Sequence, residues 1–110
     1  MLEETGLWLE QAEAELKAAG DNLGSGNYYL VAQLCQQAIE KGLKALWLET
    51  RREAPPHTHS LISLAHAVHV PERFRQALDL INPAYALARY PDVAGEVPAR
   101  LYSRKTAEDM

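Results

Sequence analysis

The stretch from residue 28 to residue 51 most constrains the fold, because it has helical periodicity and is apolar over most of its circumference. At about 100° per residue, its polar side chains share an arc of roughly 140°. That arc contains Gln33, Gln36, Gln37, Glu40, Lys41 and Lys44. A helix that is apolar over the rest of its surface needs several neighbours to cover it. The stretch is therefore predicted to be the central helix of a bundle.

The segment before it is also helical in pattern. One face gathers Trp8, Ala12, Leu16, Ala19 and Leu23. Its five glutamates, Glu15 included, are expected mostly on other faces. Gly24 and Gly26 then break the helix, and Asn27 can cap the next one. Within the central helix, Gly42 costs about 1 kcal/mol relative to Ala, and its expected benefit is the close approach of another helix.

Prolines divide the second half of the chain into shorter helices. The pair at 55–56 ends the central helix, and Thr58 or Ser60 can cap a short third helix. Pro71 suits the first turn of a fourth helix, and residues 82–83, Asn-Pro, mark a kink or restart.

The C-terminal part is expected to be a loop followed by one helix. Pro91, Gly95 and Pro98 form the loop, and the last helix starts at about residue 99 and is short or truncated. No strand pattern or internal repeat is present. The prediction is an all-α, up-and-down antiparallel bundle of four to five helices, in a single domain over residues 1–110.

Composition narrows the class of protein. Hydrophobic residues make up 47% and charged residues 24%, which is typical of a globular chain, and no apolar run could span a membrane. Cys35 is the single cysteine and lies on the apolar side of the central helix, so we expect a buried, inert thiol and a cytoplasmic location. Residues 1–50 carry three Lys or Arg against eight Asp or Glu, and residues 51–110 carry eight against seven. This distribution disfavours a broad nucleic-acid-coating surface but leaves room for a local anion site.

Two groups of polar residues are candidate sites. Lys41 and Lys44 belong to a positive stripe late in the central helix, which either complements the helix dipole or holds a phosphate or carboxylate. Four histidines, His57, His59, His66 and His69, lie within thirteen residues, but the group lacks a full set of ligand spacings, so no metal site is predicted.

The third candidate is the stretch Ala-Arg-Tyr-Pro-Asp at residues 88–92. Pro91 disfavours helical dihedrals at Tyr90, so the helix must stop there. Arg89 then lies at the helix end, and Asp92 could pair with it or with a basic group of the central helix. The alternative is a planar Arg fork and an aromatic ring collected at a cleft for a nucleotide or phosphate.

No Gly-rich phosphate loop, nucleophile elbow or zinc motif is present. The pieces "GNYYLVAQLCQQAIEKGLKALW", "PPHTHSLISL" and "ARYPD", in this order after a helix with a Trp, resemble the HEPN domain over essentially the whole chain. The resemblance implies a small helical bundle that forms a homodimer and often pairs with a minimal nucleotidyltransferase in a toxin–antitoxin module. Some members bind nucleotides. Others are metal-independent RNases whose motif is Arg, four to six residues, then His.

This sequence departs from the nuclease motif. After Arg89, the positions for the histidine hold Ala94, Gly95 and Glu96. Arg52 and His57 fit the spacing only formally, because they lie between the second and third helices. No catalytic residue is therefore assigned from this motif, and no cofactor is required.

Three hypotheses remain open. The first is a non-catalytic HEPN subunit that dimerises and binds a minimal nucleotidyltransferase and a nucleotide through Lys41, Lys44, Arg89, Tyr90 and Asp92. The second is an RNase toxin with a non-standard site, which would use Arg89 or Arg52 with His57 or His59. The third is a structural module in which Arg89→Ala lowers stability and leaves binding intact.

Overall fold

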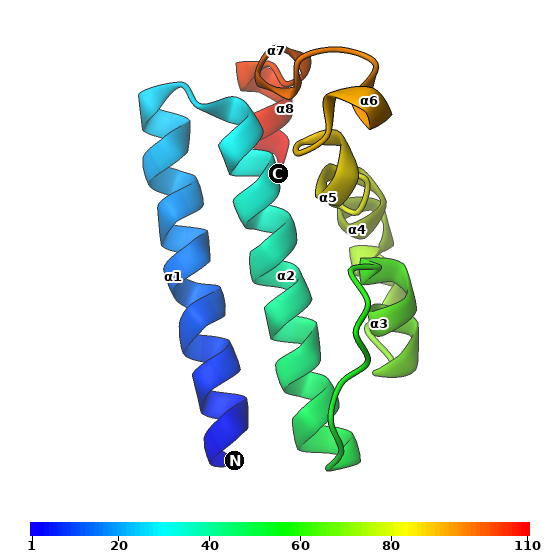
Figure 1. Ribbon diagram of the computed structural model, residues 1–110. Helices are drawn as coiled ribbons and strands as arrows, with labels where there is room; N and C mark the ends of the chain where they lie inside the picture. Colours follow the sequence, from blue (N-terminus) through cyan, green and yellow to red (C-terminus); the bar gives the residue numbers. More distant parts are fainter.

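The computed structural model describes residues 1–110, all of its secondary structure is helical, and it is built on one long helical hairpin. Helices α1 (Glu3–Ser25) and α2 (Tyr28–Arg51) run antiparallel along most of the molecule (Figure 1). Gly26 has a φ of 78° and closes α1 in the left-handed conformation, as glycine does without strain. The break predicted at Gly24 and Gly26 is confirmed at Gly26, whereas Gly24 lies inside α1.

The second half of the chain supplies short helices that cover α2. They are α3 (Leu61–Ala67), the 3₁₀ turn η1 (Glu72–Phe74), α4 (Arg75–Ile81), α5 (Ala84–Leu87), α6 (Pro91–Ala94), α7 (Pro98–Leu101) and α8 (Arg104–Asp109). Figure 1 shows α3, α4 and α5 along one side of α2, opposite α1, and α7 and α8 across its N-terminal end. The all-α bundle and the central position of α2 are confirmed.

Ser60 caps α3, since its hydroxyl accepts a hydrogen bond from the Ser63 amide at 3.2 Å. The C-terminal part differs from expectation, because Pro91 and Pro98 do not lie in a loop but at the first positions of α6 and α7. The last helix, expected as one unit from about residue 99, is two helices. Tyr102 is extended between them, and the Ser103 side chain caps α8 by accepting from the Thr106 amide.

The core is assembled from five helices, with α2 at its centre. Its buried members are Ala19, Val31, Cys35, Leu43, Leu61, Leu64, Ala65, Leu78, Ile81 and Ala107. Burial raises the pKa of the Cys35 thiol, so it is held in the unreactive protonated form, as the sequence predicted. A smaller cluster of Ala32, Ala84 and Ala88 lets α5 pack closely on α2.

Helix α1 does not present its faces as its periodicity predicts. Glu15 is buried, whereas Leu16 is 60% exposed. Polar partners on α2 accept Glu15 into the interior, so the apolar face of α1 is rotated away from the expected one. A Cβ atom at Gly42 would meet nothing within 4 Å, so no helix of this chain approaches it as expected.

Of the helices that the structure contains, none combines the length and apolar character that crossing a membrane requires.

Candidate functional site

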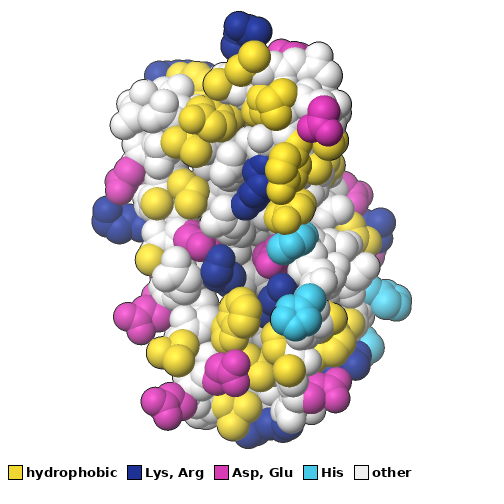
Figure 2. All heavy atoms as spheres, viewed as in Figure 1, with side chains coloured by type: hydrophobic (Ala, Val, Ile, Leu, Met, Phe, Trp, Pro, Cys, Tyr) yellow, Lys and Arg dark blue, Asp and Glu magenta, His cyan; other side chains and the backbone are white.

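The polar arc of α2 is contacted by side chains of other elements rather than by solvent alone, and we call the arc together with Glu15, His59, Tyr85 and Arg89 the polar groove. Side chains from α1, from the loop before α3 and from the end of α5 all contact it. Figure 2 shows basic, acidic and histidine side chains gathered in the middle of this face of the molecule, with hydrophobic side chains above and below them. The sequence predicted the arc, and tertiary packing turns it into a groove.

At the α1 side of the groove, the buried Glu15 carboxylate contacts three groups. Its Oε1 atom lies 2.8 Å from Nζ of Lys41 and accepts from the Gln11 amide at 3.3 Å. When the Gln37 amide is oriented to satisfy both neighbours, its nitrogen donates to Glu15 Oε1 at 3.2 Å and its oxygen accepts from Arg89 Nη2 at 2.6 Å. Gln37 therefore connects α1 with the arginine at the end of α5. The second oxygen of Glu15 is buried and has no hydrogen-bond partner.

In the middle of the groove, Glu40 receives three hydrogen bonds. Lys44 Nζ lies 3.1 Å from Oε2, while the Gln36 amide and the His59 ring both lie 3.0 Å from Oε1. Burial by itself would raise the pKa of Glu40, but the hydrogen bonds from Gln36, His59 and Lys44 outweigh it and hold the pKa below its usual value. Glu40 is therefore an ionised carboxylate. Lys44 also lies over the Trp8 ring, 5.9 Å from its centre.

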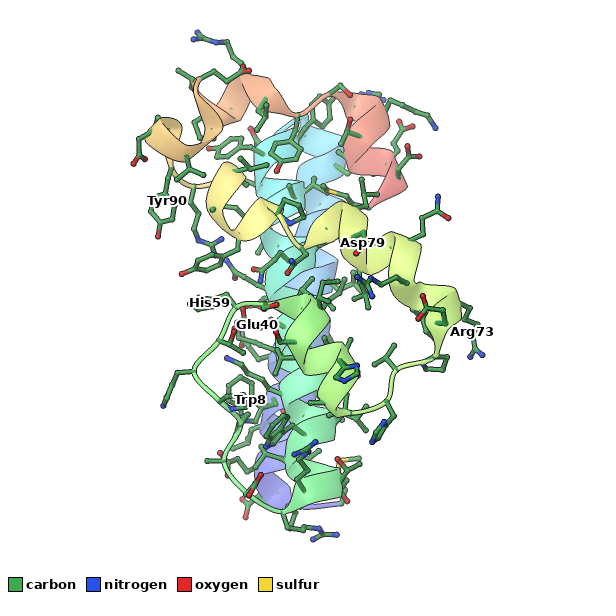
Figure 3. All side chains as sticks on the ribbon, turned by 90° about the vertical axis from the view of Figure 1, so that its right-hand side faces the viewer. Trp8, Glu40, His59, Arg73, Asp79 and Tyr90 are labelled. Atoms are coloured by element: carbon green, nitrogen blue, oxygen red, sulfur yellow. The ribbon has the colours of Figure 1, made fainter.

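His59 is held in place on two sides. Nδ1 faces the Glu40 carboxylate, and the imidazole stacks on the Tyr85 ring with 3.8 Å between ring centres and 13° between planes. Figure 3 shows His59 beside Glu40, with Trp8 below them and Tyr90 above. With an ionised carboxylate at Nδ1, the proton of a neutral ring lies on Nδ1, and Nε2 is left as an acceptor. The side chain is 51% exposed, so a ligand or solvent can reach the ring.

The Tyr85 ring also contacts Arg89. The guanidinium carbon lies 4.6 Å from the ring centre, and Nη1 donates to the Tyr85 carbonyl at 3.1 Å. Loss of solvent contact and the neighbouring Tyr90 hydroxyl raise the pKa of the Tyr85 phenol, with Arg89 opposing them. Tyr85 therefore keeps its proton and can donate a hydrogen bond. One aromatic ring thus joins the histidine of the groove to its arginine.

The stretch 88–92 forms the upper end of the groove. Gln33 donates to the Ala88 carbonyl at 2.7 Å, which fixes the end of α5 against α2. Tyr90 is extended at φ −115° and ψ 111°, as the following proline requires, and is 44% exposed. Asp92 lies exposed in the first turn of α6, but it forms no ion pair with Arg89 or with α2, so that expectation is wrong. Gln37 and the Tyr85 carbonyl take the place of Asp92 as partners of Arg89.

The groove has a small excess of positive charge. Lys41, Lys44 and Arg89 face two carboxylates, Glu15 and Glu40. The carboxylates occupy the two lysines, so neither is a free cation, and Lys44 is only 8% exposed. An anion entering the groove would meet Arg89, the more exposed Lys41 and His59 without a carboxylate left over to repel it.

Of the residues proposed from the sequence, the structure brings together Lys41, Lys44, Arg89 and Tyr90, while Asp92 stands outside their network. Sequence reasoning missed Glu15, Gln37 and Tyr85. Tyr85 had a detectable signal, because it lies four residues before Arg89 on a helical segment. His59 was considered only as a nuclease or metal residue, and nothing in its local sequence indicates that the loop places it on Glu40.

Comparison with known proteins gave two findings. The family model described as HEPN domain matches residues 5–110. The crystal structure of TT1696 from Thermus thermophilus is similar to this chain, with 34% identity, a TM-score of 0.87, and coverage of 98% of this chain and 87% of that one. No curated protein matches the sequence.

Proposed function

Because this chain belongs to the HEPN domain family, we propose that it is a non-catalytic subunit that forms a homodimer and binds a minimal nucleotidyltransferase, with a nucleotide held in the polar groove. A toxin–antitoxin-like pair is the setting that the family suggests. The RNase motif of the family is not present after Arg89, which favours binding over cleavage.

The observation that carries the nucleotide proposal is the contact of one aromatic ring with a cation and an imidazole. The centre of the Tyr85 ring lies 4.6 Å from the guanidinium carbon of Arg89 and 3.8 Å from the centre of the His59 ring. The exposed Tyr90 lies at the same end of the groove. Rings and guanidinium planes stack on nucleobases, and an arginine fork suits phosphate. A nucleotide would therefore place its base against Tyr90 and its phosphate toward Arg89 and Lys41.

The dimer proposal is supported by an unpartnered apolar surface on the hairpin. Two hollows of about 190 Å³ each lie between α1 and α2 and share Leu9. One includes Leu16 and Ile39, and the other includes Gly42 and Leu46. Leu16 is 60% exposed and Leu46 is 39% exposed. An apolar strip along two long helices is the kind of surface that a second copy of the same chain covers.

A titration tests nucleotide binding. We expect ATP or AMP to raise the melting temperature and to bind measurably by calorimetry. Tyr90→Ala should weaken binding about tenfold, since base–aromatic stacking contributes ~1–3 kcal/mol. Tyr28→Ala is a matched control, because Tyr28 is a tyrosine of α2 whose hydroxyl accepts a hydrogen bond from Arg104 of α8. No binding of any nucleotide to the unmodified protein would reject this part of the proposal.

Arg89→Ala separates the binding role from a structural one. This variant loses the contacts with Gln37 and Tyr85, so it lowers stability whichever role is correct. Lower stability with unchanged nucleotide affinity would indicate the structural module instead.

The partner proposal is tested by co-expression with the product of the adjacent gene, where co-elution of a short nucleotidyltransferase is the expected result.

An RNase is the second candidate function, and one observation favours it. His59 and Arg89 come from separate segments but contact the same Tyr85 ring, and Glu40 orients the histidine. Such a carboxylate–histidine pair leaves Nε2 available for proton transfer, while an arginine can stabilise a phosphate. This is the non-standard Arg/His site in a concrete form, and it uses His59 rather than His57.

An RNA-cleavage assay with a metal chelator present decides between the two functions. If the groove cuts RNA, His59→Ala should lower the rate at least about 100-fold, as expected for loss of a general acid–base group. His57→Ala is the matched control, since His57 is an exposed histidine of the same loop. Absence of cleavage by the unmodified protein rejects the RNase and leaves the binding proposal standing.

A further inference from the structure

A second pocket lies away from the polar groove, at the junction of α3, η1 and α4. It has a volume of about 300 Å³. In Figure 3, Arg73 and Asp79 lie on one side of α3, and His59 and Glu40 lie on the other. Figure 2 shows histidine side chains both in the middle of the face and at its right-hand edge. Its lining includes His66 and His69, neither of which belongs to the groove.

The floor of this pocket is apolar and belongs to the main core. Ala65 and Leu78 are 6% and 7% exposed and belong to the main core, and Ile62 and Val70 pack against that core. A hollow with an apolar floor accepts the hydrocarbon or aromatic body of a small molecule.

His69 is held at the rim in a strained conformation. The His69 amide bonds to the His66 carbonyl at 3.3 Å, and the Val70 amide bonds to the Ala65 carbonyl at 3.0 Å. These two bonds form the Schellman motif that ends α3, in which glycine is usual at the left-handed position. Here that position is His69, with a φ of 59°. A histidine in place of the unstrained glycine points to a use for its side chain.

The rest of the rim is polar, and most of it can donate hydrogen bonds. His66, His69, Glu72 and Arg75 all line the pocket, and Glu72 lies near Arg75. Arg75 uses Nε to bond Asp79 at 2.9 Å, so its two terminal nitrogens face no acid within hydrogen-bond distance. The donors of Arg75 and of the two imidazoles outnumber the single carboxylate that lines the pocket, that of Glu72, so the rim fits an acidic group better than a basic one.

We propose that this pocket binds a small organic anion, with its apolar body on Ala65 and Leu78 and its acidic group between Arg75 and the two histidines. The required chemistry is one anionic group, a carboxylate or phosphate monoester, attached to a body of about one aromatic ring, because a pocket of this size is at the lower limit for a small-molecule site. The site is independent of the nucleotide groove, from which it is separated by α3.

The proposal is tested by titrating the protein with three probes. Benzoate carries a carboxylate, phenyl phosphate carries a phosphate monoester, and benzyl alcohol is an uncharged analogue of similar size. We expect ¹H–¹⁵N chemical-shift changes confined to residues 62–78 for one or both anions, and binding at least tenfold weaker for the alcohol. Inorganic phosphate alone should bind more weakly than phenyl phosphate, since it leaves the apolar floor uncovered. Equal binding of the alcohol, or no shift for any probe up to about 10 mM, overturns the proposal.

Two variants test the rim without destroying the fold. Arg75→Gln should weaken anion binding about tenfold or more, which corresponds to loss of one charge-assisted hydrogen bond. Arg73→Gln is its matched control, because Arg73 stacks on Phe74 and does not line the pocket. His69→Gly keeps the left-handed turn and removes the ring, so it should raise the melting temperature by a few degrees and still weaken binding several-fold. A stabilised His69→Gly variant with unchanged affinity would show that His69 has no part in the site.

Discussion

At the scale of single residues, Glu40 holds the groove together. One carboxylate accepts hydrogen bonds from Gln36 and Lys44 of its own helix and from His59 of a loop. The Lys44 side chain is 8% exposed and the Glu40 side chain 12% exposed, so each depends on the other for compensation of its buried charge. Glu40 contacts both a buried cation and the histidine of the groove, so its loss is expected to affect stability and the position of His59.

Glu40→Gln is expected to lower the free energy of unfolding by about 3 kcal/mol, because it leaves Lys44 buried without a counter-ion. Urea unfolding at neutral pH measures this. Glu53→Gln, in the exposed loop after α2, is the control and should change stability by less than about 0.5 kcal/mol. A small effect at Glu40 would mean that Lys44 reaches solvent easily and that the pair is not structural.

The same residue makes stability depend on pH in a defined direction. The folded-state pKa of Glu40 lies below its unfolded value, so the unfolded chain binds more protons in acid. The stabilisation is present above the unfolded value of about 4.3 and is lost as pH falls through the folded-state pKa. Urea unfolding between roughly pH 5 and pH 3 should therefore show a smaller loss of stability for Glu40→Gln than for the unmodified protein. If the free energy of unfolding fell equally with pH in both proteins, the lowered folded-state pKa of Glu40 would be contradicted.

At the scale of elements, α2 carries most of the organisation. Its apolar side meets α1, α3, α4 and α8, and its polar arc meets Glu15, His59 and Arg89. Gly42 is the exception, since a Cβ atom there would meet nothing within 4 Å and the residue lines the open apolar hollow between α1 and α2. Within one copy of the chain, no contact therefore compensates for the loss of helix stability that Gly42 causes.

Gly42→Ala is expected to stabilise the isolated chain by about 0.5–1 kcal/mol, the difference between the two residues inside a helix. Gly20→Ala in α1 is the matched control, because a Cβ atom there also meets nothing within 4 Å. In thermal unfolding at low protein concentration, both variants should have a higher melting temperature than the unmodified protein. At concentrations where dimers form, only Gly42→Ala should lose its advantage, because the added methyl group would lie in the proposed interface. Destabilisation by Gly42→Ala at low concentration would contradict this account.

At the scale of the whole molecule, three surfaces face in different directions. The polar groove lies between α1, α2 and α5, the apolar strip runs along the α1–α2 hairpin, and the His66–Arg75 pocket is set into α3 and α4. Because each uses different residues, a variant in one surface should leave the other two intact, which allows the proposals to be tested separately.

Leu16→Glu is expected to convert the proposed dimer to a monomer, because it places a charge in the apolar strip. Leu80→Glu is the control, since Leu80 is 40% exposed on α4, away from the strip. Light scattering after size-exclusion chromatography measures the mass of each variant. A dimer that survives Leu16→Glu and Leu46→Glu would place the interface elsewhere, and an unmodified chain that is monomeric at all concentrations would reject the dimer.

The sequence by itself determined the helical class, the central role of residues 28–51, a glycine break before it, a cap at Thr58 or Ser60 for the third helix, and the extended Tyr90. These are local or periodic properties, fixed by φ preferences, by capping side chains and by the spacing of apolar residues. The same local rules gave Lys41, Lys44, Arg89 and Tyr90 as candidates, since residue type and position relative to helix ends can be read from the sequence alone.

Only the tertiary structure decided which of these side chains meet. It buried Glu15 against Lys41, stacked His59 on Tyr85, gave Arg89 a Gln37 partner and left Asp92 alone. The contacts join distant segments, since Glu15 and Lys41 are 26 residues apart in the chain. Their distance in space depends on how the loop after α2 and the short helices fold back on α2. A contact between distant segments follows from packing of the whole core, which no local pattern in the sequence encodes.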